Sequence, residues 1–533
     1  MSGLTGTREL LALNLRRDRF LLPAWLLACA GSAAGSAAAT VGLYPDEASR
    51  VAAAELINAT PALVAFYGPI WDPTSLGALS MFKLTGLGSV IVALFGLLIV
   101  IRHTRADEEL GRRELLAGGA LGRHASLMAG LLTAAAGSVL IGLGTAVALV
   151  GVGLPVSGSF AFGTSWCLAG LVFAGVGAGT AQLARSARAA RGLAIATLIV
   201  AFVLRAVGDT AAGSEPGLAT WLSPIGWSQQ IRPFAGDRWP VAVLSLAGAL
   251  LLSAVAAALS IRRDLGSGLL PVRRGTDRAH RLLAGPLGLA WRQQRASLLA
   301  WLMGFVLLGL VAGQILSTVD DMLTTPVARQ LVVTLGGVPG VVDAFVGVEL
   351  SFVAVFASAY GIAAVLRLVD EESSGRSDLV LAGAVGRLRW AGGHVAVALA
   401  GSALLLAAPG LVLGLAHAAE TGDDSAVGRD LVAAAVRIPA VWVLVGVAVA
   451  LYGLSRRLAP AAWGVLAATF LVSEIGPLLD LPDWVGDLSP YAHVPRLPGG
   501  ELDLGPLVAL VGVAAAFLVV GLAAVRRRDV TAA

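Results

Sequence analysis

Two charged stretches of this chain repeat one another, and each follows directly on a long apolar run. Residues 107–123 read DEELGRRELLAGGALGR, and residues 371–387 read EESSGRSDLVLAGAVGR. Aligned without a gap, they are identical at eight of 17 positions, and four further positions hold conservative replacements. Carboxylates and guanidinium groups mixed so densely can bind the charged groups of a protein partner.

The spacing of these charges predicts how they are presented. An acid four residues before an arginine stabilises a short exposed helix, and the pairs with this spacing are Glu108–Arg112, Glu109–Arg113 and Glu372–Arg376. A solvated turn whose arginines only set membrane orientation is the alternative. It does not explain the acids, because acids contribute little to orientation. We therefore expect a surface for one symmetric cytoplasmic partner, formed by Glu108, Glu109, Arg112, Arg123, Glu372, Arg376 and Arg387.

The sequence argues against other kinds of chemistry. A phosphate-cradling loop for ATP needs Gly-Lys-Ser/Thr, but the chain's one lysine, Lys83, follows Phe82. Cys29 and Cys167 have no metal-ligand spacing. Asp423 and its neighbour Asp424 resemble a metal pair, yet a solvated turn explains them better. We expect no catalytic residue, no metal and no cofactor in this chain.

Composition places the chain in a membrane. Of its 533 residues, 57% are hydrophobic and 14% are charged, whereas soluble domains carry roughly 25% charged residues. One large soluble domain is excluded because its surface would lack polar cover, and the net charge of +4 needs no nucleic-acid partner. The expected fold is an all-α polytopic membrane protein.

Twelve apolar runs are long enough to cross the hydrocarbon core, which takes about 20 residues each. The expected spans are 20–44, 79–101, 127–154, 159–183, 192–208, 239–261, 298–318, 347–368, 391–416, 435–454, 459–475 and 505–525. With both termini on one side, that side carries 29 of the 38 lysines and arginines, which predicts cytoplasmic termini.

The twelve spans form two halves. The LSP motif before the sixth span returns before the twelfth, and RRD follows both, at 262–264 and 527–529. The residues just before the first span resemble those before the seventh, and the alignment pairs Arg16 with Arg292. This disfavours a cleaved signal peptide, because an internal copy cannot be a cleaved signal. We expect two parallel six-helix repeats, 1–262 and 298–533, joined by a cytoplasmic linker, 263–297, that contains the second of two interfacial elbow segments.

The loop pattern acidic-Glu-x2-Gly-Arg-x-Glu/Asp-Leu, after the second span of a 6+6 chain, resembles the permease subunits of actinobacterial ABC exporters of polyketide antibiotics and other drugs. The resemblance covers the whole chain. It implies a type V exporter fold and a loop that acts as a coupling helix on a separate, dimeric ATPase, which binds ATP and Mg²⁺. It also implies multidrug efflux and antibiotic resistance. The second loop departs from the first at Ser373 and Ser377, which makes the two docking contacts unequal.

The same resemblance suggests where a hydrophobic or amphipathic substrate passes, because the second and fifth spans of each half line the path. The candidates are Lys83, Phe82, Phe95, Phe202, Arg205, Glu349, Phe352, Phe356 and Tyr360. For Lys83 and Glu349, which could form a charge at the outer gate between the halves, the alternative is a simple ion pair or a lysine that extends to the membrane surface. Phe352, Phe356 and Tyr360 are expected on one face of the eighth span, and the alternative to contact with substrate is ordinary packing. Lipid export is equally compatible with these residues.

A proton-coupled drug antiporter is the alternative function. It usually needs an acid deep in the membrane, and none is expected at mid-span. Glu349, Glu420 and Glu474 lie at outer ends, and His394 lies near a cytoplasmic end.

Overall fold

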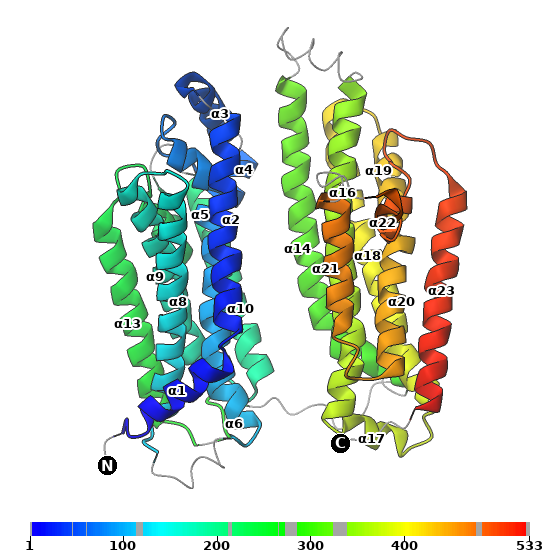
Figure 1. Cartoon of the computed structure of the whole chain (residues 1–533), viewed down its shortest axis with the longest axis horizontal. Helices are drawn as coiled ribbons and strands as arrows, with labels where there is room; N and C mark the ends of the chain where they lie inside the picture. The colour runs from blue at the N-terminus through cyan, green and yellow to red at the C-terminus, as the bar shows by residue number, and fades with distance from the viewer. Residues whose placement is uncertain are drawn as a thin grey trace. The chain divides into compact units, whose positions relative to one another are not determined.

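A computed structural model describes residues 3–44, 46–59, 61–112, 121–211, 216–264, 266–271, 285–322, 338–475 and 482–528. In this part of the chain every regular element is a helix (Figure 1). The chain divides into two compact units, Met1–Arg274 and Gly275–Ala533, and the boundary falls inside the segment expected as a linker. Each unit is described by itself below.

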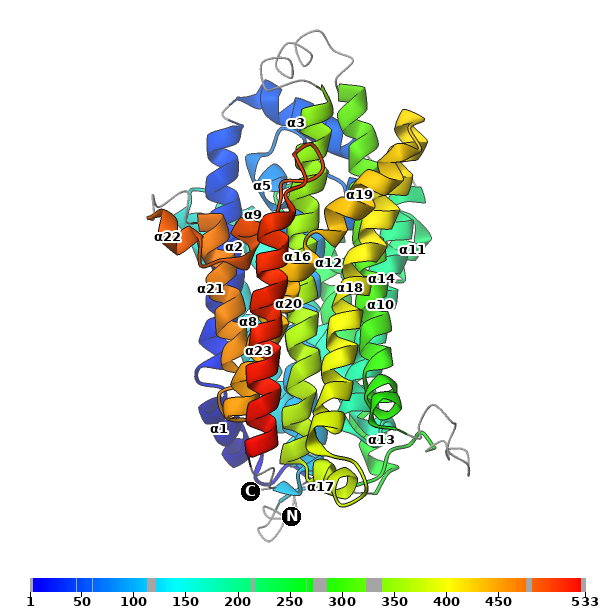
Figure 2. The same cartoon turned by 90° about the vertical axis from the view of Figure 1, so that its right-hand side faces the viewer.

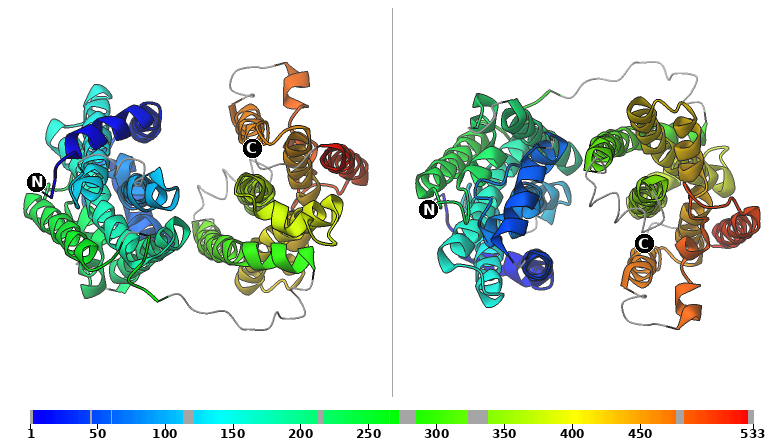
Figure 3. Two further views of the ribbon diagram at one scale, coloured as in Figure 1. Left: turned by 90° about the horizontal axis from the view of Figure 1, so that it is seen from below. Right: turned by 90° about the horizontal axis from the view of Figure 1, so that it is seen from above.

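Unit 1 is a bundle built around one central helix. Its helices are α1 (Thr7–Arg17), α2 (Leu21–Leu43), α3 (Glu47–Ala59), α4 (Pro61–Tyr67), α5 (Leu76–Ile101) with the π-helical turn η1 (Arg102–Ala106), α6 (Asp107–Glu109), α8 (Ala125–Gly151), α9 (Val156–Leu183), α10 (Ala187–Ala211), α11 (Leu218–Trp221), α12 (Pro224–Gln230) and α13 (Trp239–Ile261). Helix α9 packs against α5, α8 and α13, as the end-on views of Figure 3 show. In the most apolar part of α9 72% of residues are buried, against 17% in α2 and α13, so these two helices lie on the outside of the unit.

Unit 2 is also a bundle of helices. They are α14 (Pro286–Met322), α16 (Val338–Ser373), α17 (Arg376–Leu381), α18 (Arg387–Thr421), α19 (Ser425–Ala435), α20 (Ile438–Leu454), α21 (Ala461–Ile475), α22 (Asp483–Gly486), the 3₁₀ turn η4 (Pro490–His493) and α23 (Leu504–Arg527). Helices α16, α18 and α20 pack on one another, and α23 lies along α20 (Figure 2).

Ten helical segments among the described residues are long and apolar enough to cross a membrane, which makes this a multi-pass membrane protein. Each coincides with one of the twelve expected spans. The remaining two expected spans, 298–318 and 459–475, fall in α14 and α21. The first is only partly described beyond residue 310, and the second is 15 residues long.

The two elbow segments differ. In unit 1 the expected elbow is a separate helix, α1, which ends before α2 begins. In unit 2 the corresponding residues belong to the single 37-residue helix α14, which runs on into the seventh expected span. A reason lies in the chain: Asp18 binds His103 at 2.5 Å and holds the α1–α2 junction, whereas the aligned residue of unit 2 is the uncharged Gln294.

Small residues let the central helices approach closely, as is common in membrane bundles. A Cβ atom added at Gly96 of α5 would collide with the backbone carbonyl oxygen of Gly170 in α9, whereas one at Gly179 of α9 would meet nothing within 4 Å. Unit 2 repeats this close approach between Gly453 of α20 and Gly521 of α23.

We expect Gly96→Ala to lower the free energy of unfolding by about 1–3 kcal/mol, because helices α5 and α9 must move apart. Thermal unfolding of the purified protein in mild detergent measures the change. Gly179→Ala is the matched control and should be neutral or slightly stabilising, since alanine favours the helix by about 1 kcal/mol. Equal unfolding midpoints for the two variants would show that the contact does not limit stability.

Candidate functional site

The first copy of the repeated charged loop is anchored to the last helix of unit 1. The carboxylate of Glu108 accepts hydrogen bonds from both terminal nitrogens of Arg263, each at 2.8 Å, and one from the backbone N–H of Gly266 at 2.6 Å. Arg263 lies just beyond α13 and belongs to the RRD motif. The side chains of Glu108 and Arg263 are only 5% and 7% exposed, so this is a buried bidentate ion pair.

The second copy is anchored in the same way. The carboxylate of Glu372 accepts a hydrogen bond from Arg528 at 2.7 Å and another from the hydroxyl of Tyr452 in α20 at 2.9 Å. Arg528 follows α23 directly and is the middle residue of the second RRD motif. Tyr452 belongs to the fourth expected span of unit 2. In unit 1 Arg263 contacts the fourth expected span as well, by donating to Gln182 of α9 at 2.6 Å.

We call each of these ion pairs, Glu108–Arg263 and Glu372–Arg528, a loop clamp. In each unit the clamp joins the end of the second expected span to the end of the last helix. The end of a unit that carries its clamp is called its loop end. Two segments that repeat in the sequence, the charged loop and RRD, therefore bind one another within each unit.

The expected pairing of charges four residues apart is wrong. Arg112 binds Asp107 at 2.9 Å, and Arg376 binds Glu371 at 2.9 Å. In each loop the arginine thus pairs with the acid five residues before it, because the next acid is turned inward to the clamp. Arg113 lies outside the described residues.

A glycine turn explains this pairing. The backbone of Gly111 has φ 68° and that of Gly375 has φ 69°, a left-handed conformation that other residues adopt only with strain. The turn ends α6 in unit 1 and separates α16 from α17 in unit 2. A continuous exposed helix through either loop is therefore excluded at this point.

Two further expected residues, Arg123 and Arg387, also hold the loop to the last helix. Arg123 donates to the carbonyl oxygen of Ile261, and Arg387 donates to that of Arg528 at 2.7 Å. A guanidinium group at a helix C-terminus satisfies unpaired carbonyl groups and complements the helix dipole. The Gly-Arg that closes each copy of the repeat is thus an internal contact.

The two loops differ at the position of Glu109. Its carboxylate accepts a hydrogen bond from the backbone N–H of Ala187 at 2.9 Å and so caps the start of α10. The aligned Ser373 bonds only the carbonyl oxygen of Asp370, in its own turn. The expected inequality of the two loops therefore has a structural counterpart within the units.

Several of the expected docking residues are used in internal contacts, so the exposed surface of the described loops is smaller than the sequence predicts. Leu379, in the middle of α17, is 81% exposed, although it is a large apolar residue. Arg376 and Asp378 lie exposed on either side of it. In unit 1 Leu110 and half-exposed Arg112 are the described residues with a comparable position.

The sequence analysis missed the arginines of the clamps, the hydroxyl of Tyr452 and the role of Asp107. One signal was present, because RRD occurs once at the end of each half. Opposite charges at the cytoplasmic ends of the second and last spans of both halves would have predicted their pairing.

Asp107 also binds the elbow helix. Its carboxylate accepts two hydrogen bonds from Arg17, at 2.7 and 3.2 Å, in addition to the bond from Arg112. The hydrogen bond to Asp107 raises the pKa of Arg17 above its usual value, so this guanidinium stays charged at any physiological pH. The elbow helix and the repeated loop are thus joined in unit 1.

The candidate path residues of unit 1 are dispersed. Phe95 is fully buried and packs on Trp25 at 5.4 Å, so it is a core residue. Lys83 is exposed, with its ammonium 5.6 Å from the ring of half-buried Phe82. Phe202 is half-buried and lies 4.4 Å from the guanidinium of Arg205.

In unit 2 the three aromatic residues of α16 do not share one face. Phe356 is 48% exposed and Phe352 lies 6.4 Å from Phe470 of α21, whereas Tyr360 is 1% exposed and contacts Trp301. Four residues turn an α-helix by about 400°, so eight residues rotate the side chain by about 80°. The expectation of one face is wrong for Tyr360. Glu349 is half-buried.

The structure adds two buried polar pairs close to the ends of spans. Arg205 lies 3.6 Å from Asp209 in α10, and His417 of α18 lies 3.3 Å from Asp430 of α19. Arg205 also donates to the carbonyl oxygen of Phe66 at 3.0 Å, which fastens α10 to the end of α4. The side chains of Glu420 and Glu474 lie outside the described residues.

Known proteins match both units. The sequence family defined as the C-terminal domain of the multidrug efflux system permease Rv1217c matches residues 283–526. The full-length relative, the multidrug efflux system permease protein Rv1217c of Mycobacterium tuberculosis, is 43% identical over 532 residues. That alignment covers 99% of this chain and 96% of the relative. With its many apolar helices and this near full-length similarity, the chain belongs to the family of multidrug efflux system permeases.

Proposed function

We propose that this chain is the membrane-spanning permease subunit of an ATP-driven exporter, working with a separate ATPase. It exports hydrophobic or amphipathic compounds, including drugs, from a bacterial cell. The chain spans the plasma membrane twelve times as two parallel six-helix repeats. The observation that carries the proposal is the loop clamp, which is built twice from repeated sequence, once in each unit.

The clamps support a mechanical role. A loop that only turns the chain needs no buried ion pair, because solvent satisfies its charges at little cost. The ion pair, which is bidentate in unit 1 and has one hydrogen bond in unit 2, joins the loop to the ends of the second and last spans as one element. A force applied to the loop is then passed to the last helix of the same unit. Two such elements suit two copies of one driving subunit.

The charge distribution supports a cytoplasmic position for the loop ends. The segments on the side of the termini carry 29 of the 38 lysines and arginines but only 13 of the 34 acids. Basic residues are retained on the cytoplasmic side of bacterial membrane proteins. We infer that ATP, Mg²⁺ and an ATPase dimer act there, and that Leu379 with Arg376 and Asp378 forms part of the docking surface in unit 2.

Co-purification tests the proposal. The tagged protein is extracted from its own host in mild detergent, and every co-purifying chain is identified. We expect an ATPase with a Walker A motif, at two copies per permease. Its reproducible absence, together with export that persists after ATP depletion, would contradict the proposal.

The buried pair His417–Asp430 favours a second candidate, a proton-coupled antiporter, because a buried acid beside a histidine can carry protons. Export that collapses when the proton gradient is dissipated, at constant ATP, would support it. Asp430→Asn would then abolish export, whereas in an ATP-driven exporter it should change export only through folding. Export of lipid instead of drugs would change only the transported substrate, and the energy source would be the same.

A further inference from the structure

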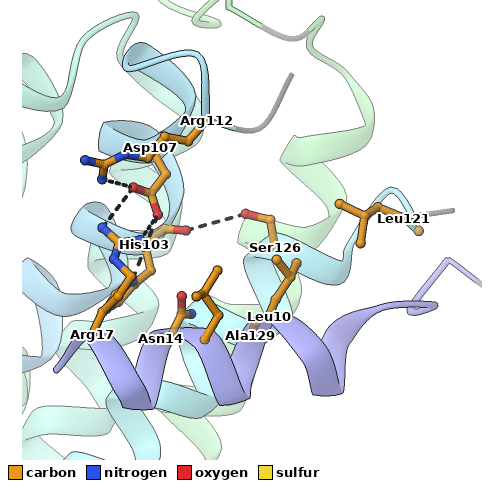
Figure 4. Close-up of a pocket in the computed structure, with 11 residues that line it drawn as sticks. Leu10, Asn14, Arg17, His103, Asp107, Arg112, Leu121, Ser126 and Ala129 are labelled. Atoms are coloured by element: carbon orange, nitrogen blue, oxygen red, sulfur yellow. Dashed lines mark hydrogen bonds and ion pairs between the residues drawn. The ribbon is translucent and has the colours of Figure 1, made fainter. Parts of the chain in front are cut away.

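A cavity of about 300 Å³ lies at the loop end of unit 1, next to the elbow helix α1. Figure 4 shows its lining, which comes from three segments: α1, the turn from η1 to Arg112, and the stretch from Leu121 into the start of α8. The lining is divided by chemistry. Leucines lie along one part, and the ionic group around Asp107 forms another.

The ionic part carries an excess of positive charge. The guanidinium groups of Arg17 and Arg112 both bind the single carboxylate of Asp107. A guanidinium has five N–H donors, and the bond to Asp107 at 2.9 Å uses one donor of Arg112. Because Arg112 is also half-exposed, it can bind an additional anion that reaches the cavity.

A second, independent observation indicates a ligand. His103 lines the cavity, and its side chain is completely buried. Its Nε2 atom binds Asp18, but its Nδ1 atom has no hydrogen-bond partner among the described residues and lies 4.0 Å from Oδ2 of Asp107. Buried polar atoms are nearly always paired in folded proteins, so a polar atom of a bound molecule is expected beside Nδ1.

The apolar part is suited to hydrocarbon. Leu10 and Leu13 of α1 line it together with Leu121 and Ala129. Helix α1 precedes the candidate span α2 directly, so the cavity lies at the depth where headgroups meet acyl chains. A small free anion would leave this apolar wall uncovered, and an uncharged hydrocarbon would leave the remaining donors of Arg112 and the Nδ1 atom of His103 unused.

We propose that this cavity binds an anionic glycerophospholipid of the adjoining membrane leaflet. Its phosphate is bound by Arg17 and Arg112, and the first part of an acyl chain packs on Leu10, Leu13 and Leu121. Basic pockets at the cytoplasmic side of membrane helices bind anionic headgroups in this way. The proposal goes beyond the export function and does not depend on how export is driven.

The internal repeat predicts that this site exists only in unit 1. The two copies align Arg17 with Gln293 and Ser126 with Trp390. Glutamine cannot replace the charge, and the large side chain of Trp390 is fully buried where unit 1 has the serine. We therefore expect one such lipid for each chain.

Native mass spectrometry of the full chain in mild detergent tests this. Phosphatidylglycerol and phosphatidylcholine with identical acyl chains are titrated separately. We expect one phosphatidylglycerol to bind at least tenfold more tightly than phosphatidylcholine. The double variant Arg17→Gln/Arg112→Gln should lower that affinity at least tenfold, and the single variant Arg16→Gln, on the exposed side of α1, should leave it unchanged.

A second variant separates binding from folding. Leu13→Glu places a negative charge in the cavity from an exposed position, whereas Ala12→Glu, also exposed, lies outside the lining. Only Leu13→Glu should lower the affinity. Equal binding of the two lipids, or equal effects of the two glutamates, would overturn the proposal. Displacement of the lipid by millimolar glycerol phosphate would also overturn it, since the site would then bind a small anion.

Discussion

Arg263→Gln is expected to cost about 1.5–3 kcal/mol of the stability of unit 1 and to lower export at least tenfold. The reason is that Glu108 loses both hydrogen bonds from Arg263 and keeps Arg105, 3.2 Å away, and the N–H of Gly266. Loss of a hydrogen bond to a charged group costs about that much. Thermal unfolding in detergent measures the first effect, and drug accumulation in intact cells measures the second. Arg528→Gln should act in the same way on unit 2.

The control for Arg263→Gln is the neighbouring arginine. Arg262 lies next to Arg263 and is exposed, so Arg262→Gln should change stability by less than about 0.5 kcal/mol. If Arg262→Gln and Arg263→Gln unfold at the same temperature, the clamp does not hold the loop. The clamp also shows that reversing Glu108 or Glu372 to arginine cannot test docking by itself, because the reversal breaks the fold of the loop end first.

Leu379→Asp is expected to abolish recovery of an ATPase partner with the permease while the permease itself stays folded. Leu379 is 81% exposed, so aspartate costs the free protein almost nothing. Burial of a leucine in an interface contributes about 2 kcal/mol, which corresponds to roughly thirtyfold in affinity. Co-purification at fixed detergent and salt measures the loss, and an unchanged unfolding temperature shows that folding is intact.

The matched control for this prediction is Leu488→Asp. Leu488 is 69% exposed in the same unit, but it precedes α23 and so lies away from the loop end. It should leave recovery of the partner unchanged. Full recovery with Leu379→Asp would place docking elsewhere on the loops, whereas equal losses with both variants would indicate a general effect on the detergent-solubilised protein.

Much of the helical plan could be predicted from apolar runs. Ten expected spans coincide with helices of the described chain, because a run of about 20 apolar residues has few alternatives in a membrane. The elbow of unit 2 could not be predicted in the same way. The charged segment before each span is similar, but in unit 1 Asp18, between α1 and α2, binds Arg102 and His103 at the end of another helix.

The path residues show a second limit. Two residues four positions apart point in similar directions, because four residues rotate an α-helix about 40° past a full turn. Over eight residues this difference doubles. Phe356 therefore remains exposed on α16 while Tyr360 enters the core beside Trp301. Periodicity predicted that these residues are helical and did not predict which of them are accessible.

By itself the sequence determined that this protein is an all-helical membrane protein with a repeated half, a repeated charged loop and no ATP-binding loop of its own. Only the tertiary structure decided what the charges of that loop bind. Sequence spacing reports neighbours within one helix, such as Glu108 and Arg112. Glu108 does have a local partner, Arg105, three residues before it at 3.2 Å. Its bidentate partner, Arg263, is 155 residues away and is brought to it by the packing of α13 on the bundle. An ionic contact is determined by distance in space, and in a bundle the closest charges come from the ends of different helices.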